Sequence, residues 1–350
     1  MRMAKPLLTA LLCPLVAAGL SISAPSASAD VLSVGRILDG AKLAPVLVAD
    51  TGAVEPGIVR IDTSLQFQSA IGAGAGVVLS PDGIVLTNNH VIRGANEITA
   101  TNVGNGQKYT ADVVGYDRKS DIAVLQLRGA TNLPVAPTAD SSRLLVGDPV
   151  TAVGFPEGAG LTRAPGPVRA LDQSIVANDE LTGSAEQLSG LIEFAADIRP
   201  GDSGGPLVDP AGQVVGIVTA ASQTYEMTDA GGFAIPLNQA LPISDAIRSG
   251  NAVGSVHIGP TAILGIGVNN TRNDAGVPVQ GVLRGGPADQ AGLSGGDVIT
   301  AIDATPIPDG TVLTDVLDGH RPGDTVTVNY LDGARNPQTA PVTLVVGPPN

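Results

Sequence analysis

Residues 200–206 (PGDSGGP) place a serine among glycines. A serine hydroxyl is a poor nucleophile at its ordinary pKa and needs an adjacent general base. Acyl transfer also needs backbone N–H donors directed at the developing oxyanion. Glycine permits the tight turn that points such donors inward. The segment therefore predicts Ser203 as a nucleophile, with an oxyanion hole at Gly201, Asp202 and Ser203 in which the N–H groups of Gly201 and Ser203 donate.

The general base for such a serine is histidine, and the chain has three: His90, His257 and His320. His90 ends a strand-like hairpin, whereas the other two lie in a separate C-terminal unit, and we expect them to be non-catalytic. An acid must orient the imidazole by binding its second nitrogen. Asp121 opens an apolar strand-like run and is best placed for burial; the alternatives nearby are Asp112 and Asp117. The sequence predicts a triad in the order His90, Asp121, Ser203.

These residues need a scaffold, and residues 75–235 consist of short apolar runs separated by turn signals. Residues 80–83 (SPDG) are a strong hairpin signal between two such runs. Many short strands at this spacing predict a mainly β domain, either a barrel or a sandwich. A helix is expected at 237–247, followed by a small polar linker at 249–255. A second unit at 256–346 combines strand-like runs with a helix at 311–317 and a helical turn at 287–293.

Composition excludes several classes of protein. The chain has 350 residues, a length that favours two domains. It has 33 acidic and 19 basic residues, which give a formal net charge of −14. This balance argues against nucleic-acid binding, which requires a basic surface. A hydrophobic content of 43% excludes a disordered chain. No cluster has the spacing of metal ligands, so we expect no metal and no other cofactor.

The first 29 residues predict a secretory signal peptide. Arg2 and Lys5 precede an apolar run at 7–20, and Ala27-Ser28-Ala29 forms the cleavage site before Asp30. The apolar run is too short for a comfortable membrane span, so an uncleaved anchor is the less favoured alternative. The single cysteine, Cys13, would leave with the signal. We therefore expect a secreted protein, or one of the cell envelope or periplasmic space, with no membrane span after cleavage.

Several stretches together resemble the HtrA/Deg family of chymotrypsin-fold serine proteases. They are AGVVLSPDGIVLTNNHVI (75–92), VVGYDRKSDIAVLQL (113–127), IRPGDSGGPLV (198–208), ILGIGV (263–268) and GGPADQAGLSGGDVITAID (285–303). The resemblance implies a mainly β fold, with a chymotrypsin-like double β-barrel protease domain at 54–248 followed by a PDZ domain at 256–346. An N-terminal arm at 30–53 would precede the barrels.

The resemblance also implies the activity and the partners. We expect a serine endopeptidase that hydrolyses unfolded or damaged proteins, with a PDZ domain that binds peptide C-termini. A chaperone-like or peptide-binding protein with weak or latent proteolysis is the alternative. Family trimers commonly use aromatic residues in the N-terminal arm, and residues 30–64 contain none, so a trimer is in doubt. Whether the PDZ domain activates the barrels or delivers substrate stays open.

Two positions depart from the family pattern. Family members usually have asparagine immediately before the serine, whereas this chain has Asp202, an aspartate as in the digestive proteases. Asp197, six residues before Ser203, stands where trypsin-like enzymes hold the acid that selects Lys or Arg substrates, although a relocated loop acid is the more favoured interpretation. The resemblance otherwise implies small or medium aliphatic residues at the cleavage position. The substrate-binding candidates are Asp197, Ile198, Thr219, Ala220 and Ala221.

The PDZ domain should capture a carboxylate with N–H groups of the 263–266 loop. A bound peptide would add as a strand beside residues 266–268 and face the 311–317 helix. The residues that this arrangement implies are Ile263, Leu264, Gly265, Ile266, Val268, Val312 and Val316.

Overall fold

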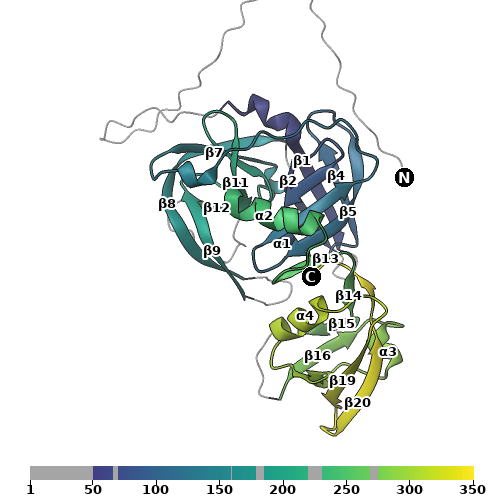
Figure 1. The fold of residues 1–350 in the computed structure, drawn as a ribbon. Helices are drawn as coiled ribbons and strands as arrows, with labels where there is room; N and C mark the ends of the chain where they lie inside the picture. Colours follow the sequence, from purple (N-terminus) through teal and green to yellow (C-terminus); the bar gives the residue numbers. More distant parts are fainter. Residues whose placement is uncertain (1–49, 66–69, 159, 179–184, 220–230, 269–274) are drawn as a thin grey trace, which may run out of the picture. The chain divides into compact units, whose positions relative to one another are not determined.

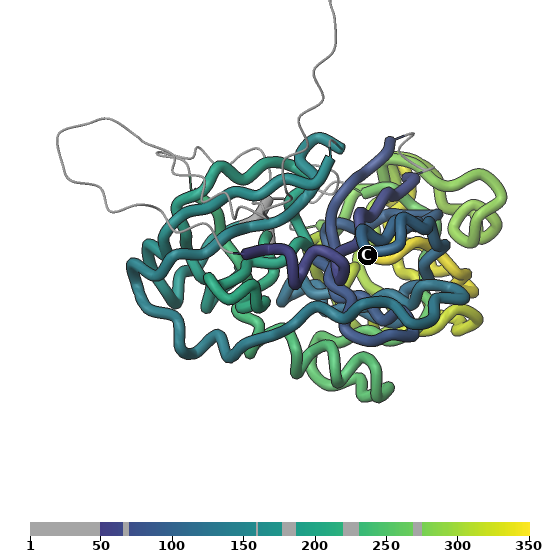
Figure 2. The backbone as a smooth tube through the Cα atoms, turned by 90° about the horizontal axis from the view of Figure 1, so that it is seen from above, coloured from purple at the N-terminus to yellow at the C-terminus, as the bar shows by residue number. Residues whose placement is uncertain are grey.

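The computed structural model describes residues 50–350, apart from 66–69, 159, 179–184, 220–230 and 269–274 (Figure 1). The predicted signal peptide and most of the predicted arm lie outside the described residues. The described chain opens with two 3-10 turns, Thr51–Ala53 and Glu55–Gly57, which lead into the first strand (Figure 2). Asp50 caps the first turn by accepting the Gly52 N–H.

Six antiparallel strands close into a first barrel. They are β1 (Ile58–Leu65), β2 (Ala70–Val78), β3 (Ile84–Thr87), β4 (Glu97–Asn102), β5 (Lys108–Asp117) and β6 (Ile122–Leu127). The ladder runs β5-β4-β1-β2-β3-β6, and β5 also pairs with β6, so the sheet returns to its start. The predicted 80–83 turn joins β2 to β3 and is confirmed, with Gly83 at a φ of 91°. Alternate residues of β1 are buried, as expected for strands with one face on a core.

A second six-stranded barrel follows. Its strands are β7 (Pro149–Gly154), β8 (Thr162–Asn178), β9 (Ala185–Phe194), β10 (Pro206–Val208), β11 (Val214–Thr219) and β12 (Gly232–Pro236). They close in the order β10-β11-β12-β9-β8-β7. One apolar core cluster draws residues from both barrels, including Leu86 and Val124 from the first and Val153 and Ile217 from the second. The barrels are therefore packed on each other through a shared core.

Short helical elements connect and cover the barrels. Two further 3-10 turns lie at Ser141–Arg143 and Pro156–Gly158, and the short helix α1 (Asn89–Ile92) follows β3. The predicted helix at 237–247 is confirmed as α2 (Leu237–Arg248). It buries Leu237, Ala240, Ser244 and Ile247, one face at helical spacing. Among the described residues, no helix combines the length and apolar character that crossing a membrane requires.

The C-terminal unit has its own sheet and core. Its elements are β14 (Thr261–Ile263), β15 (Ile266–Val268), β16 (Val277–Val282), α3 (Pro287–Gln290), β17 (Val298–Ile302), β18 (Thr305–Pro306), α4 (Gly310–Asp318), β19 (Thr325–Leu331), β20 (Pro337–Thr343) and β21 (Val345–Gly347). The main sheet runs β15-β16-β17-β19-β20, and β14 pairs with β21. The predicted 311–317 helix is confirmed as α4, which Asp309 caps by accepting the Val312 N–H.

One strand of this region belongs to another sheet. Val256–Ile258 forms β13, which pairs with β5 and so extends the sheet of the first barrel. The sequence analysis assigns this segment to the start of the PDZ domain. Apolar periodicity indicates that a segment is a strand, but it does not show with which strand the segment pairs. The described residues from 50 onward belong to one compact unit. The mainly β fold of two barrels followed by a PDZ-type sheet is confirmed.

Candidate active site

The strand register brings His90 and Asp121 together. Thr87 at the end of β3 pairs with Ala123 near the start of β6, so residues just after β3 lie beside residues just before β6. His90 Nδ1 lies 2.8 Å from Asp121 Oδ2. The backbone N–H of His90 also donates to Asp121 Oδ1, at 2.9 Å. The competing acids Asp112 and Asp117 are engaged elsewhere, with Arg128 and with the backbone of residues 119 and 120.

Asp121 is buried and fixed from several sides. Its residue is 3% exposed, and Thr219 Oγ1 donates to Oδ2 at 3.0 Å. Asn88 Nδ2 donates to its backbone carbonyl at 2.9 Å. Burial alone would raise the pKa of this carboxyl, but the charge and hydrogen bonds of His90 outweigh it and hold the pKa below its ordinary value. The ionised carboxylate only accepts, so Nδ1 of His90 carries a proton and Nε2 is left to act as a base.

Ser203 lies at the seam of the two barrels and is 5% exposed. Its carbonyl accepts the N–H of Ala75 in β2, at 2.8 Å. The next residue, Gly204, donates to Val218 in β11, also at 2.8 Å. Gly204 has a φ of 81°, and a Cβ there would lie 2.1 Å from the Ala75 carbonyl oxygen. Only glycine fits this position, which anchors the nucleophile candidate between the barrels.

The loop before Ser203 forms a tight turn. Asp202 N–H donates to the Arg199 carbonyl at 3.0 Å, and Gly201 has the positive φ, 104°, of the third residue of a type II turn. The Pro200 carbonyl accepts the Glu157 N–H at 2.7 Å. Because a trans peptide directs its C=O and N–H to opposite sides, the Gly201 N–H points away from Glu157. This orientation suits an oxyanion-hole donor.

Asp202 is a buried acid within this loop, 4% exposed. Its Oδ2 accepts the Arg199 N–H at 2.9 Å. Burial raises its pKa and the nearby charge of Asp197 adds to the rise, while the hydrogen bond from Arg199 opposes it. The net shift is upward. The carboxylate thus braces the turn that shapes the predicted oxyanion hole.

Comparison with known proteins agrees with this geometry. A trypsin-like peptidase domain model matches residues 74–217, and a PDZ domain model matches residues 262–344. The chain is 33% identical over 340 residues to the chloroplastic Protease Do-like 1 of Arabidopsis thaliana, covering 88% of this chain and 74% of that protein. The chain belongs to the HtrA family of serine proteases.

Other HtrA-family proteins give the same result. The periplasmic serine endoprotease DegP of Escherichia coli K12 is 36% identical over 250 residues, which cover 69% of this chain and 50% of that protein. A solved structure, the HtrA-type protease AlgW with a tripeptide, is 30% identical at a TM-score of 0.50 and covers 86% of this chain and 97% of that one. The chain spans less than two thirds of the length of the curated relatives that it matches first.

Three of the predicted substrate-binding residues of this HtrA-family chain, Asp197, Ile198 and Thr219, lie in the described part of the structure. Asp197 is exposed at the surface and pairs with Arg199, with Oδ2 2.7 Å from Nη2. Ile198 lies against Gly232, at the start of β12. Thr219 bonds the Asp121 carboxylate. Ala220 and Ala221 lie outside the described residues. Arg199 therefore partly offsets the charge of Asp197 at this exposed position.

A cavity of about 570 Å³ lies at the predicted carboxylate loop and is lined by five of the predicted residues, Ile263, Leu264, Gly265, Ile266 and Val268. The Leu264 carbonyl accepts the Ala288 N–H, and the Gly265 carbonyl accepts the Leu283 N–H. A trans peptide directs its C=O and N–H to opposite sides, so the N–H groups of Gly265 and Ile266 point away from Ala288 and Leu283. β15 is also an edge strand of its sheet, which leaves one side for an added strand.

Helix α4 meets this cavity with a different set of residues from the one expected. Gly310, Leu313, Thr314 and Leu317 line it, whereas Val312 and Val316 lie one position away and pack against the domain core. The sequence has two adjacent apolar pairs at the same helical spacing, so periodicity alone does not show which pair faces the groove.

The structure adds a role for Thr219 and a residue, Asn88, that the sequence analysis does not single out. The Thr219 hydroxyl donates to the acid of the His90–Asp121 pair, in addition to its predicted place among the substrate-binding residues. Asn88 holds the backbone of the same acid, and only its position two residues before His90 could have suggested this. The two other histidines lie in structural positions. His257 stacks on Tyr116, with ring centroids 4.8 Å apart. His320 Nδ1 lies 3.6 Å from Asp324 Oδ2. Within the described ranges, no group of three or more acidic, histidine or cysteine side chains could hold a metal ion.

Proposed function

We propose that this chain is a serine endopeptidase with Ser203 as nucleophile, His90 as general base and Asp121 as the acid that orients His90. The observation that carries the proposal is the His90–Asp121 pair, held at 2.8 Å beside a loop turned for an oxyanion hole. Asp112 and Asp117, the alternatives for the acid, have other partners.

Each step of the reaction has a residue in this chain. His90 Nε2 takes the proton of Ser203 as Oγ attacks the peptide carbonyl. The N–H groups of Gly201 and Ser203 stabilise the oxyanion that forms. The imidazolium, stabilised by Asp121, then gives its proton to the leaving amine and an acyl-enzyme remains. Water attacks this ester with His90 again as base, which releases the product and restores Ser203.

We infer that the substrates are unfolded or damaged proteins outside the cytoplasm, in the periplasm, the envelope or the medium. The DegP relative is named a periplasmic endoprotease, and the first 29 residues of this chain have the pattern of a signal peptide. The pairing of Asp197 with Arg199 favours small or medium aliphatic residues at the cleavage position over basic ones. The cavity at residues 263–268 supports binding of peptide C-termini. A homo-oligomer is compatible with the family, and the arm without aromatic residues argues against a trimer built on them.

Casein cleavage by the wild type and by Ser203→Ala tests the catalytic assignment. We expect cleavage to be lost in the variant, and labelling by a fluorophosphonate to be lost with it. Equal activity of both proteins would refute the role of Ser203. The cavity also favours a second candidate, a chaperone-like peptide binder: suppression of aggregation that survives in Ser203→Ala would support it.

A further inference from the structure

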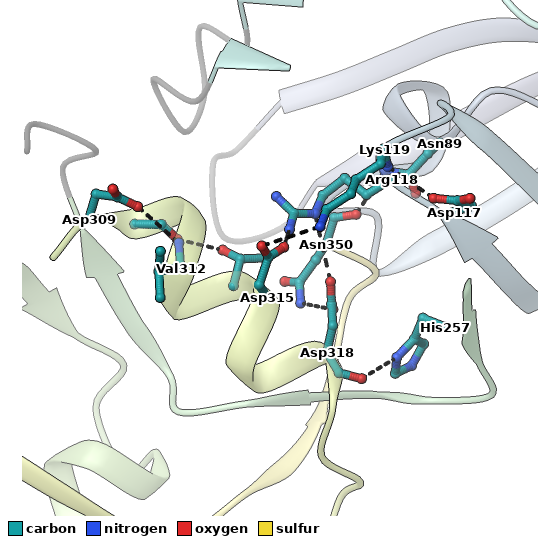
Figure 3. Close-up of polar contacts among 12 residues, drawn as sticks. Asn89, Asp117, Arg118, Lys119, His257, Asp309, Val312, Asp315, Asp318 and Asn350 are labelled. Carbon is teal, nitrogen blue, oxygen red and sulfur yellow. Dashed lines mark hydrogen bonds and ion pairs between the residues drawn. The ribbon is translucent and has the colours of Figure 1, made fainter. Parts of the chain in front are cut away.

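Helix α4 of the PDZ domain contacts the first barrel through two acids. Asp315 and Asp318 point from α4 toward Arg118, which follows β5 (Figure 3). Arg118 Nη2 bonds Asp315 Oδ1, and its Nε lies 3.7 Å from Asp318 Oδ2. The Arg118 side chain is only 7% exposed. A guanidinium this well buried is costly to keep without its counter-charges, so the two acids hold it in place.

Arg118 begins the turn that ends at the proposed catalytic acid. Its carbonyl accepts the Asp121 N–H at 3.2 Å. The Asp117 carboxylate stiffens the turn by accepting the N–H groups of Lys119 and Ser120 at 3.1 and 3.3 Å. Asp121 itself has a φ of 53°, a left-handed conformation that non-glycine residues keep only when their surroundings impose it. Anchoring the Arg118 side chain is one such constraint.

The same helix also reaches the segment that carries His90. Asn350 Nδ2 donates to Asp318 Oδ1 at 2.8 Å, and the Asn350 carbonyl accepts Asn89 Nδ2 at 2.9 Å. The carbonyl of the preceding Pro349 accepts the Gly94 N–H at 2.8 Å. Asn89 directly precedes His90 and Gly94 follows α1, so both ends of the His90 helix are held.

We propose that Asp315 and Asp318 are positioning residues for the His90–Asp121 pair, acting through Arg118 on the 118–121 turn and through Asn350 on α1. The inference rests on the proposed endopeptidase function. A misplacement of about 1 Å in a catalytic group can cost roughly 100-fold in rate. Catalysis in the barrels thus depends on a helix outside them, and the two acids affect the rate of the chemical step more than the affinity for substrate.

The experiment compares the full chain with the double variant Asp315→Asn/Asp318→Asn. Readouts are kcat and KM on a short peptide substrate, the rate of Ser203 modification by a small fluorophosphonate and the pH–rate profile. We expect kcat and the modification rate to fall at least about tenfold with little change in KM. The small reagent needs no PDZ groove, so its slowing separates positioning from substrate delivery. The pH–rate profile is a further readout, which a loss of stability alone would leave unchanged.

Matched variants keep the test decisive. Arg118→Lys retains the charge and should restore part of the rate lost in Arg118→Gln. Arg128→Gln removes the exposed Arg128–Asp112 ion pair of the same barrel and should leave the rate unchanged. The proposal is overturned if Arg118→Gln and the double variant keep the wild-type kcat, modification rate and pH profile, even at a lower melting temperature. A wild type that neither cleaves peptide nor reacts with the reagent would instead overturn the proposed function beneath it.

Discussion

At the scale of single residues, the buried acid beside the nucleophile makes stability depend on pH. Burial raises the pKa of Asp202, so the folded chain binds its proton more tightly than the unfolded chain does. The group therefore stabilises the fold below its unfolded pKa, and this contribution is lost as pH rises through the higher folded value. Asparagine keeps an acceptor for the Arg199 N–H and carries no charge.

We therefore predict that Asp202→Asn melts at a higher temperature than the wild type at pH 7. The difference should shrink toward zero at about pH 3, where the wild-type carboxyl is also neutral. Calorimetry across this pH range measures it. An asparagine variant that melts lower at pH 7 would show that the carboxylate braces the turn more than its burial costs.

Gly201 gives the second prediction for single residues. Its φ is 104°, and a Cβ would lie 2.2 Å from the Phe155 carbonyl oxygen, so Gly201→Ala must distort the turn. Loss of one oxyanion-hole donor costs roughly 10²–10³ in kcat, and we expect a fall of this size on a peptide substrate. Gly106→Ala is the control, because Gly106 also has a positive φ, 68°, but has no atom within 4 Å of the added Cβ. A comparable loss of activity in both variants would count against a specific role for Gly201.

At the scale of elements, the cap of α4 is a separable contribution. Asp309 accepts the Val312 N–H at 2.9 Å, and removing a helix cap costs about 1 kcal/mol. Asp309→Ala should lose about this much in urea denaturation, whereas Asp309→Asn, which keeps a capping oxygen, should lose almost nothing. Binding of a C-terminal peptide to the adjacent cavity should weaken in the alanine variant only. Equal loss in both variants would mean that the aspartate charge, and not the cap, matters.

The same scale shows what the sequence could predict. The 80–83 turn, α2 and α4 were predictable because hairpin residues and apolar periodicity are local signals. The pairing of β13 with β5 was not predictable, because the residues of a strand do not indicate which distant strand it pairs with. The triad candidates were predictable from residue types and order, but the anchoring of Arg118 by α4 joins residues almost 200 positions apart.

At the scale of the whole molecule, the distribution of the cores predicts how the protein unfolds. One cluster is shared by the two barrels and contains Ile217, whereas the PDZ cluster draws only on residues 262–344 and contains Leu293. A buried core residue contributes to every element that packs on its cluster. The barrels should therefore lose structure together, and the PDZ domain has a core that can be weakened by itself.

Two matched truncations test this arrangement. Ile217 and Leu293 are 0% and 1% exposed, and replacing either by alanine should cost roughly 2–5 kcal/mol. In calorimetry, Ile217→Ala should lower the transition that coincides with loss of fluorophosphonate labelling. Leu293→Ala should lower the transition that coincides with loss of C-terminal peptide binding. If both variants instead lower one common transition equally, the two barrels and the PDZ domain unfold as one cooperative unit. The contacts of α4 with the first barrel are then strong enough to transmit the loss of one core to the other.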